Sequence, residues 1–174
     1  MSTKVHTKLP GTEVDFTLSG PWTGYWIAFL RLMTGYWFFH AGLTKFLESG
    51  GFSAEGYLLY ATKGTIVGPI TVWFGNNAVW FADIMIPLGE LLIGLGLMVG
   101  ALTRLAAFFG AFLMFFFYFG NQSWSHGFVS SDMMGLLLFG TVIVFGAGRV
   151  WGLDQYIEQT DVVQNNRWMR YFLG

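Results

Sequence analysis

Long apolar segments alternate with shorter polar ones along most of the chain. Four segments approach the length of about 20 apolar residues that a helix needs to cross a bilayer. They run from Trp22 to Thr44, from Ala78 to Val99, from Leu102 to Phe119 and from Asp132 to Ala147. The pattern therefore predicts an all-α integral membrane protein, an antiparallel bundle of four transmembrane helices.

The connections between these segments differ in length and character. Only a short turn around Gly100 separates the second segment from the third, so these two should form a tight antiparallel hairpin. Residues 48–77 form a long connection of mixed polarity, which we expect to be an extracytoplasmic loop at the membrane interface. Residues 1–21 are expected to be a polar N-terminal tail, residues 22–152 the four-helix domain, and residues 153–174 a C-terminal cytoplasmic tail.

Basic residues are distributed unequally between the two sides of this predicted bundle. One side carries Lys4, Lys8, Arg104, Arg149, Arg167 and Arg170, whereas the other carries Lys45 and Lys63. Because basic residues near helix ends favour the cytoplasm, both termini should be cytoplasmic. We therefore expect a multi-pass protein whose main partner is the lipid bilayer.

Composition agrees with this picture and narrows the chemistry. Hydrophobic residues make up 54% of the chain and charged residues only 11%, against about 25% charged in soluble domains. The absence of cysteine excludes disulfides, thiolate metal ligands and thiol redox relays. Nine basic residues balance ten acidic ones without forming a basic stripe, so nucleic acid is not an expected partner.

Ionisable residues inside the predicted helices mark the candidate site. A charge at bilayer depth costs at least about 2.5 kcal/mol, so each one is expected to have a partner. If the first two helices begin level, Arg31 lies opposite Glu90. The same arithmetic places His40 beside Asp83, which shares a helix face with Glu90. We predict an Arg31–Glu90 pair at mid-depth and a His40, Asp83 cluster nearer the outer surface; a pair that only fixes helix register is the alternative.

A polar loop between the third and fourth predicted helices is the second candidate region. Trp124, His126 and Asp132 lie in or beside it on the predicted outer side. There they would form the rim of a pocket with His40, Lys45 and Asp83. An ordinary solvated loop is the alternative. The three histidines of the chain show no metal-ligand spacing, so neither a metal nor a haem is predicted.

Two glycine-containing stretches carry a further pattern, from Phe29 to Phe46 and from Gly89 to Phe112. Its residues are Arg31, Gly35, Gly42 and Lys45 in the first stretch, and Glu90, Gly94, Gly96, Gly100 and Arg104 in the second. With this pattern the chain resembles the DoxX/DoxD family of small four-helix membrane proteins. The glycines themselves allow helix backbones to approach closely.

The resemblance implies a membrane subunit of a quinone-linked oxidoreductase in a prokaryotic plasma membrane. DoxD is a subunit of a thiosulfate:quinone oxidoreductase, so oxidation of thiosulfate or another sulfur compound is implied, with quinone as substrate or cofactor and separate protein subunits as partners. On this hypothesis the catalytic residues are Glu90, Asp83 and His40, and the substrate-binding residues are Arg31, Lys45, Trp124, His126 and Asp132.

A non-catalytic assembly or anchoring subunit of a larger respiratory complex is the alternative function. It is motivated by the lack of a recognisable redox cofactor site, thiol or metal site in the sequence. A small transporter is disfavoured by the short chain and by the lack of a clear inverted repeat.

Overall fold

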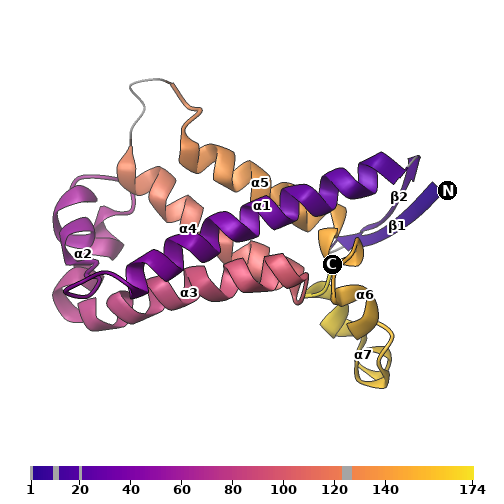
Figure 1. The fold of residues 1–174 in the computed structure, drawn as a ribbon. Helices are drawn as coiled ribbons and strands as arrows, with labels where there is room; N and C mark the ends of the chain where they lie inside the picture. The colour runs from indigo at the N-terminus through magenta and orange to yellow at the C-terminus, as the bar shows by residue number, and fades with distance from the viewer. Residues whose placement is uncertain (1, 10–11, 20, 123–126) are drawn as a thin grey trace.

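Four long helices form the body of the molecule. The structure, a computed structural model, describes residues 2–9, 12–19, 21–122 and 127–174. The long helices are α1 (Pro21–Phe46), α3 (Val79–Val99), α4 (Thr103–Asn121) and α5 (Ser131–Phe145). They run side by side in alternating directions (Figure 1), and each lies where an apolar segment predicted a helix. The predicted helical fold is confirmed.

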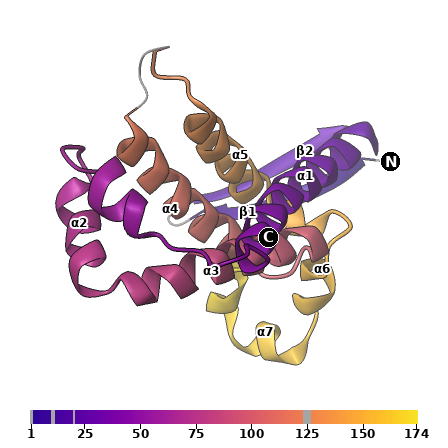
Figure 2. The same cartoon turned by 60° about the vertical axis from the view of Figure 1, so that its left-hand side comes forward.

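The two ends of this bundle have different connections. At one end, here called the turn end, residues 100–102 join α3 to α4. The turn end also holds the chain that follows α5, with η3 (Ala147–Arg149), α6 (Asp154–Ile157), α7 (Asp161–Asn165) and η4 (Arg167–Tyr171). At the opposite end, the loop end, residues 47–78 join α1 to α3 and include η1 (Tyr57–Ala61) and α2 (Gly68–Asn77) (Figure 2).

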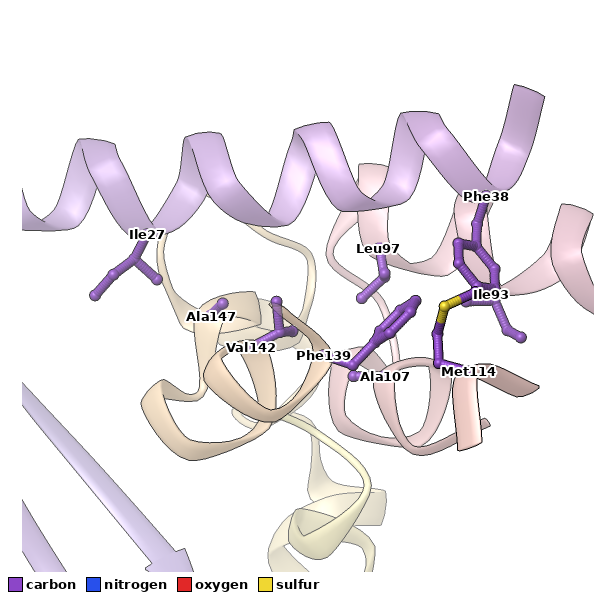
Figure 3. Packing of buried hydrophobic residues seen from close by; sticks show 9 residues of the cluster. All are labelled: Ile27, Phe38, Ile93, Leu97, Ala107, Met114, Phe139, Val142 and Ala147. Atoms are coloured by element: carbon purple, nitrogen blue, oxygen red, sulfur yellow. The ribbon is translucent and has the colours of Figure 1, made fainter. Parts of the chain in front are cut away.

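The core of the bundle is apolar and draws on all four long helices. Phe139 of α5 is fully buried, and its ring meets Phe38 of α1 edge to face at a centroid distance of 4.8 Å. Figure 3 shows the cluster, whose members are Ile27, Phe38, Ile93, Leu97, Ala107, Met114, Phe139, Val142 and Ala147. Large aromatic and aliphatic side chains remain exposed on the outside of the helices, as expected of a bundle surrounded by lipid.

Helices α1 and α3 pack backbone against backbone. A Cβ atom added to Gly94 would collide with the backbone of Phe39, and one added to Gly42 would lie 2.6 Å from the backbone nitrogen of Leu91. Small residues at such crossings let helices approach closely, as the glycine pattern predicted. These contacts fix how far α1 slides along α3, and therefore which of their charges meet.

The polar segment before α1, predicted as a tail, contains two strands. β1 (Ser2–Leu9) and β2 (Thr12–Ser19) pair antiparallel, with Ser2 opposite Ser19 and Leu9 opposite Thr12. The alternation of polar and apolar residues in Thr12–Ser19 is the sequence signal for a strand. The hairpin lies beside α1 and α5 at the turn end (Figure 1).

Candidate functional site: a buried ion pair between α1 and α3

A buried ion pair joins the last turn of α1 to the middle of α3. Lys45 Nζ lies 2.6 Å from Glu90 Oε2. The Glu90 side chain is 4% exposed and the Lys45 side chain 26%, so the pair opens to the outside on the Lys45 side. Lys45 Nζ also donates to the carbonyl of Ala41 at 3.4 Å and lies 5.8 Å from the ring centroid of Phe52. This geometry places exchangeable protons beside apolar surface.

The offset between α1 and α3 explains why these two residues meet. An added Cβ on Gly100, the residue that ends α3, would collide with the guanidinium of Arg31, so Arg31 lies level with the end of α3. The stretch of α1 from Pro21 to Leu30, ten residues long (30 − 21 + 1), therefore extends beyond α3. Because of this offset, Lys45 on the last turn of α1 reaches Glu90 near the middle of α3.

The predicted Arg31–Glu90 pair is wrong. Arg31 is 1% exposed and lies at the turn end, where its Nη1 donates to the carbonyl of Ala147 and its Nη2 to the carbonyl of Trp151, each at 3.1 Å. The prediction assumed that the first two helices begin level, whereas α1 is shifted by about ten residues. Arg31 therefore holds the chain after α5 against α1 instead of neutralising a buried acid.

Asp154, which the sequence analysis did not select, organises the turn end. Its Oδ1 accepts from the backbone nitrogen of Leu102 at 2.7 Å, and its Oδ2 accepts from those of Thr103 at 2.9 Å and Gly174 at 3.1 Å. The first N–H groups of a helix lack partners within the helix, so Asp154 caps α4 from a distant part of the chain. Burial raises the pKa of the Asp154 carboxyl, and hydrogen bonds, chiefly from Thr103, act in the opposite direction.

A signal for this cap is present in the sequence. The N-cap position of helix α4 is Leu102, whose side chain cannot cap the helix as Ser, Thr, Asp or Asn would. Asp154 is fully buried although it lies within residues 153–174, which were predicted to be a cytoplasmic tail. An uncapped helix start and an acid a short distance after the last apolar segment together indicate a remote cap.

The predicted cluster of His40 and Asp83 is also wrong. His40 is exposed on α1, with its ring 6.0 Å from that of Tyr36. Asp83 lies near the start of α3, where its Oδ1 accepts from the backbone nitrogen of Ala54 at 2.6 Å. The same offset separates the two residues. Asp83 therefore anchors the connection that follows α1.

The loop between α4 and α5 is described only in part. Trp124 and His126, predicted to bind substrate, lie outside the described residues. Asp132 lies in the first turn of α5 and accepts from the Asn121 amide at 2.8 Å. Nearby, burial and to a lesser degree Asp132 raise the pKa of the Tyr57 hydroxyl to about 12. That hydroxyl is buried and makes no hydrogen bond among the described residues. Asp132 is thus separate from the Lys45–Glu90 pair, toward the loop end.

The rest of the described chain adds no metal centre. Within residues 2–9, 12–19, 21–122 and 127–174, no three histidine or acidic side chains are grouped so that they could hold a metal ion. The chemistry that the site can offer is therefore that of the ion pair: a hydrogen-bond donor, a carboxylate and a proton that the two can share.

Length and hydropathy define the class of protein. Within the described chain, α3 and α4 are long and apolar enough to cross a membrane, and α5 is a shorter apolar helix. Apolar helices of this length, with a polar pair enclosed between them, are compatible with a membrane protein.

Comparison with protein families gives the specific assignment. The DoxX family model matches residues 26–122, which is more than half of the chain, and the protein belongs to the DoxX family, whose members are membrane-associated. Arg31, Lys45 and Glu90 all lie inside the matched range. No curated protein and no solved structure matches the chain.

Proposed function

We propose that the protein is the membrane subunit of a quinone-linked oxidoreductase, with the Lys45–Glu90 pair as its polar centre. The observation that carries the proposal is the position of this pair, buried near the middle of α3 and open only on the Lys45 side. Reduction of a quinone to a quinol takes up two electrons and two protons, so a site within a membrane needs a proton-exchanging group beside apolar surface.

The two members of the pair have different roles in this proposal. Lys45 donates a hydrogen bond to a quinone carbonyl oxygen and passes this proton to the oxygen as the quinone is reduced. The Glu90 carboxylate takes up a proton from the open side of the pair and returns it to Lys45, and the second proton of the quinol follows by the same route. The quinone ring lies against Phe52, whose ring already borders the Lys45 ammonium. Lys45 takes the role first expected of Arg31, because the Arg31 guanidinium is bound to backbone carbonyls at the turn end.

In this proposal the electrons reach the quinone through a separate partner subunit, which the family resemblance supports, and the cysteine-free chain has no thiol relay of its own. For the donor we propose a reduced sulfur anion such as thiosulfate, which the family resemblance supports. Two thiosulfate ions join through a new S–S bond and release two electrons, which combine with a quinone and two protons to form the quinol. The exposed side chains of His40 and Lys63 are the groups that we propose attract this anion.

The proposed topology places α1, α3, α4 and α5 across a prokaryotic plasma membrane, with both termini in the cytoplasm. The distribution of basic residues supports this orientation. Arg31, Arg104 and Arg149 all lie at the turn end, whereas Lys45 and Lys63 lie toward the loop end. Basic residues favour the cytoplasmic side, so the turn end is the cytoplasmic one in this proposal.

A second candidate function is assembly or anchoring without catalysis. The observation that favours it is the use made of the other buried charges. Arg31 and Asp154 both bind backbone groups of the protein itself, as expected of residues that maintain a scaffold. In this case the Lys45–Glu90 pair fixes the contact between α1 and α3 and performs no chemistry.

Replacement of Glu90 distinguishes the two functions. The complex is purified with its partner subunit, and reduction of decylubiquinone by thiosulfate is measured for the parent, Glu90→Gln and Glu48→Gln, the last being an exposed acid just after α1. We expect Glu90→Gln to lower turnover by about 100-fold with the partner retained, because a proton-transfer group contributes about 10²–10⁴-fold. Glu48→Gln should match the parent.

Two other results would count against the proposal. Parental turnover in Glu90→Gln would remove the pair from the chemistry. Loss of the partner subunit from Glu90→Gln, together with normal turnover in the fraction of complex that still assembles, would assign the pair to assembly.

A further inference from the structure

The C-terminal segment, residues 151–172, exposes a large amount of aromatic surface. Trp151 is 67% exposed, Tyr156 63% and Trp168 60%. Other large apolar side chains of the segment are also exposed, namely Leu153, Val162, Tyr171 and Phe172. Side chains of this kind are not expected to extend into water in such number, so the segment has an apolar neighbour.

The segment is held in a fixed position on the bundle. At its start, the backbone nitrogen of Leu153 donates to the carbonyl of Val99 at 3.1 Å. At its end, the carbonyl of Phe172 accepts from the backbone nitrogen of Leu105 at 3.2 Å. Figures 1 and 2 show that, between these points, α6 and α7 project sideways from the turn end instead of continuing along the helices. The segment therefore extends roughly parallel to the plane of a membrane crossed by the bundle.

Exposed apolar side chains are also present where the long helices meet this segment. Val99 and Leu102, at the junction of α3 and α4, are about half exposed. On the other side, a shallow apolar groove separates the projecting start of α1 from Trp151, and the rings of Tyr25 and Trp151 approach to 4.7 Å between centroids. The groove is lined by Trp22, Tyr25, Ala28, Phe29, Leu32 and Trp151. Both sides of the junction between the bundle and the segment therefore expose apolar side chains.

The charges of the segment suit the edge of a bilayer. Glu158 is paired with Arg149, with Arg149 Nη2 and Glu158 Oε1 2.8 Å apart, and Asp154 is buried. Arg167 is exposed beside Trp168, and Arg170 donates from Nη2 to Gln164 at 2.8 Å. Tryptophan, tyrosine and arginine are the residues that collect where lipid headgroups meet acyl chains.

We propose that the C-terminal segment lies within the headgroup–acyl boundary of the phospholipid bilayer at the turn end, as a surface anchor whose aromatic side chains enter the lipid. An acyl chain occupies the groove between α1 and Trp151. The proposal is independent of the quinone chemistry, and it differs from the expectation of a cytoplasmic tail.

The cysteine-free chain allows a direct test. Single-cysteine variants Trp168→Cys and Tyr156→Cys carry a nitroxide label in vesicles of phosphatidylethanolamine and phosphatidylglycerol. Collisions with oxygen, which concentrates in lipid, are compared with collisions with a water-soluble nickel chelate. Asp161→Cys, in an exposed polar position of the same segment, is the matched control, and Phe108→Cys, on the outside of α4, reports embedding of the bundle.

The ratio of oxygen to nickel collisions should be several-fold higher for the labels at 156 and 168 than for the label at 161. Nickel collisions at 156 and 168 as frequent as at 161 would place the segment in water and overturn the proposal. Labels at 156 and 168 that are inaccessible to both reagents would show that protein covers the segment, which also overturns it. A label at 108 that oxygen does not reach would show that the bundle is not embedded in the bilayer, and this result would also overturn the proposal.

Discussion

The two ends of the helical bundle differ in how their buried polar side chains are hydrogen-bonded. At the turn end, the buried charges of Arg31 and Asp154 bind backbone groups through several hydrogen bonds each. Toward the loop end, Asp83 accepts from the backbone nitrogen of Ala54 and Asp132 accepts from the Asn121 amide, whereas the buried Tyr57 hydroxyl has no partner within the described residues. Buried charges therefore tie separate parts of the chain together at the turn end, whereas the loop end keeps a buried polar group without a partner among the described residues.

Asp154→Asn should have the largest effect, because it acts on the turn end. An amide in place of the carboxylate removes the charge and turns an NH₂ group toward backbone donors at Leu102, Thr103 and Gly174. We expect a loss of about 3 kcal/mol in the free energy of unfolding, since a buried donor left unpaired costs about 1–3 kcal/mol. Unfolding of the detergent-solubilised protein by denaturant measures this loss.

Asp161→Asn is the control for that experiment, because Asp161 is exposed in the first turn of α7. It should change the free energy of unfolding by less than about 0.5 kcal/mol. Equal effects of the two substitutions would show that Asp154 does not hold the turn end together.

Gly94→Ala tests the close contact between α1 and α3, in the part of the bundle between its two ends, and should have an intermediate effect. The added methyl group collides with the backbone of Phe39, so α1 must move away from α3. We expect a loss of about 1–3 kcal/mol in the free energy of unfolding, typical of overpacking. Gly89→Ala on the same helix, where no atom lies within 4 Å of the added Cβ, should be neutral or stabilising by up to about 1 kcal/mol. Indistinguishable effects would argue against the close crossing.

Tyr57→Phe, at the loop end, should have the smallest effect at neutral pH. The lost hydroxyl has no hydrogen-bond partner within the described residues, so the free energy of unfolding should change by less than about 1 kcal/mol, and an increase is allowed. Tyr60→Phe, at an exposed neighbouring position, is the control. A large loss in Tyr57→Phe alone would reveal a partner for the hydroxyl and make the two ends alike.

Alkaline pH separates Tyr57 from its control. The pKa of Tyr57 in the folded protein is about 12, above the ordinary value of 10.0, so folding favours the protonated hydroxyl. Its contribution to stability is complete below about pH 10 and declines as the pH rises toward 12. The parent and Tyr60→Phe should lose this contribution over that range, whereas Tyr57→Phe has none to lose. The unfolding midpoint as a function of pH measures the difference.

Much of the fold was predictable from the lengths and polarity of the apolar segments. These features indicate where helices begin and end, and the short turn at Gly100 requires an antiparallel α3–α4 hairpin. They do not indicate how far one helix slides along another. That offset depends on close backbone contacts such as Gly42 against Leu91 and Gly94 against Phe39, which cannot be inferred from segment length.

The candidate site was predictable in its members and not in its pairing. Lys45 and Glu90 were both selected as polar residues in or beside apolar helices, and the structure brings them together. Because α1 is offset along α3, Glu90 pairs with Lys45, and Arg31 donates to backbone carbonyls at the turn end. Asp154 was missed because it follows the last apolar segment, and its burial depends on the chain folding back onto the start of α4.

The spacing of the two basic residues on α1 has a mechanical consequence. Arg31 and Lys45 are 14 residues apart (45 − 31), or about 21 Å along the helix axis. Arg31 and the glycine contacts hold α1 along α3 as far as Gly42. Lys45 lies three residues (45 − 42) beyond Gly42, in the last turn of the helix. A change in the distance between Lys45 and Glu90 would therefore involve this last turn and the chain beyond Phe46, and not a slide of the whole helix.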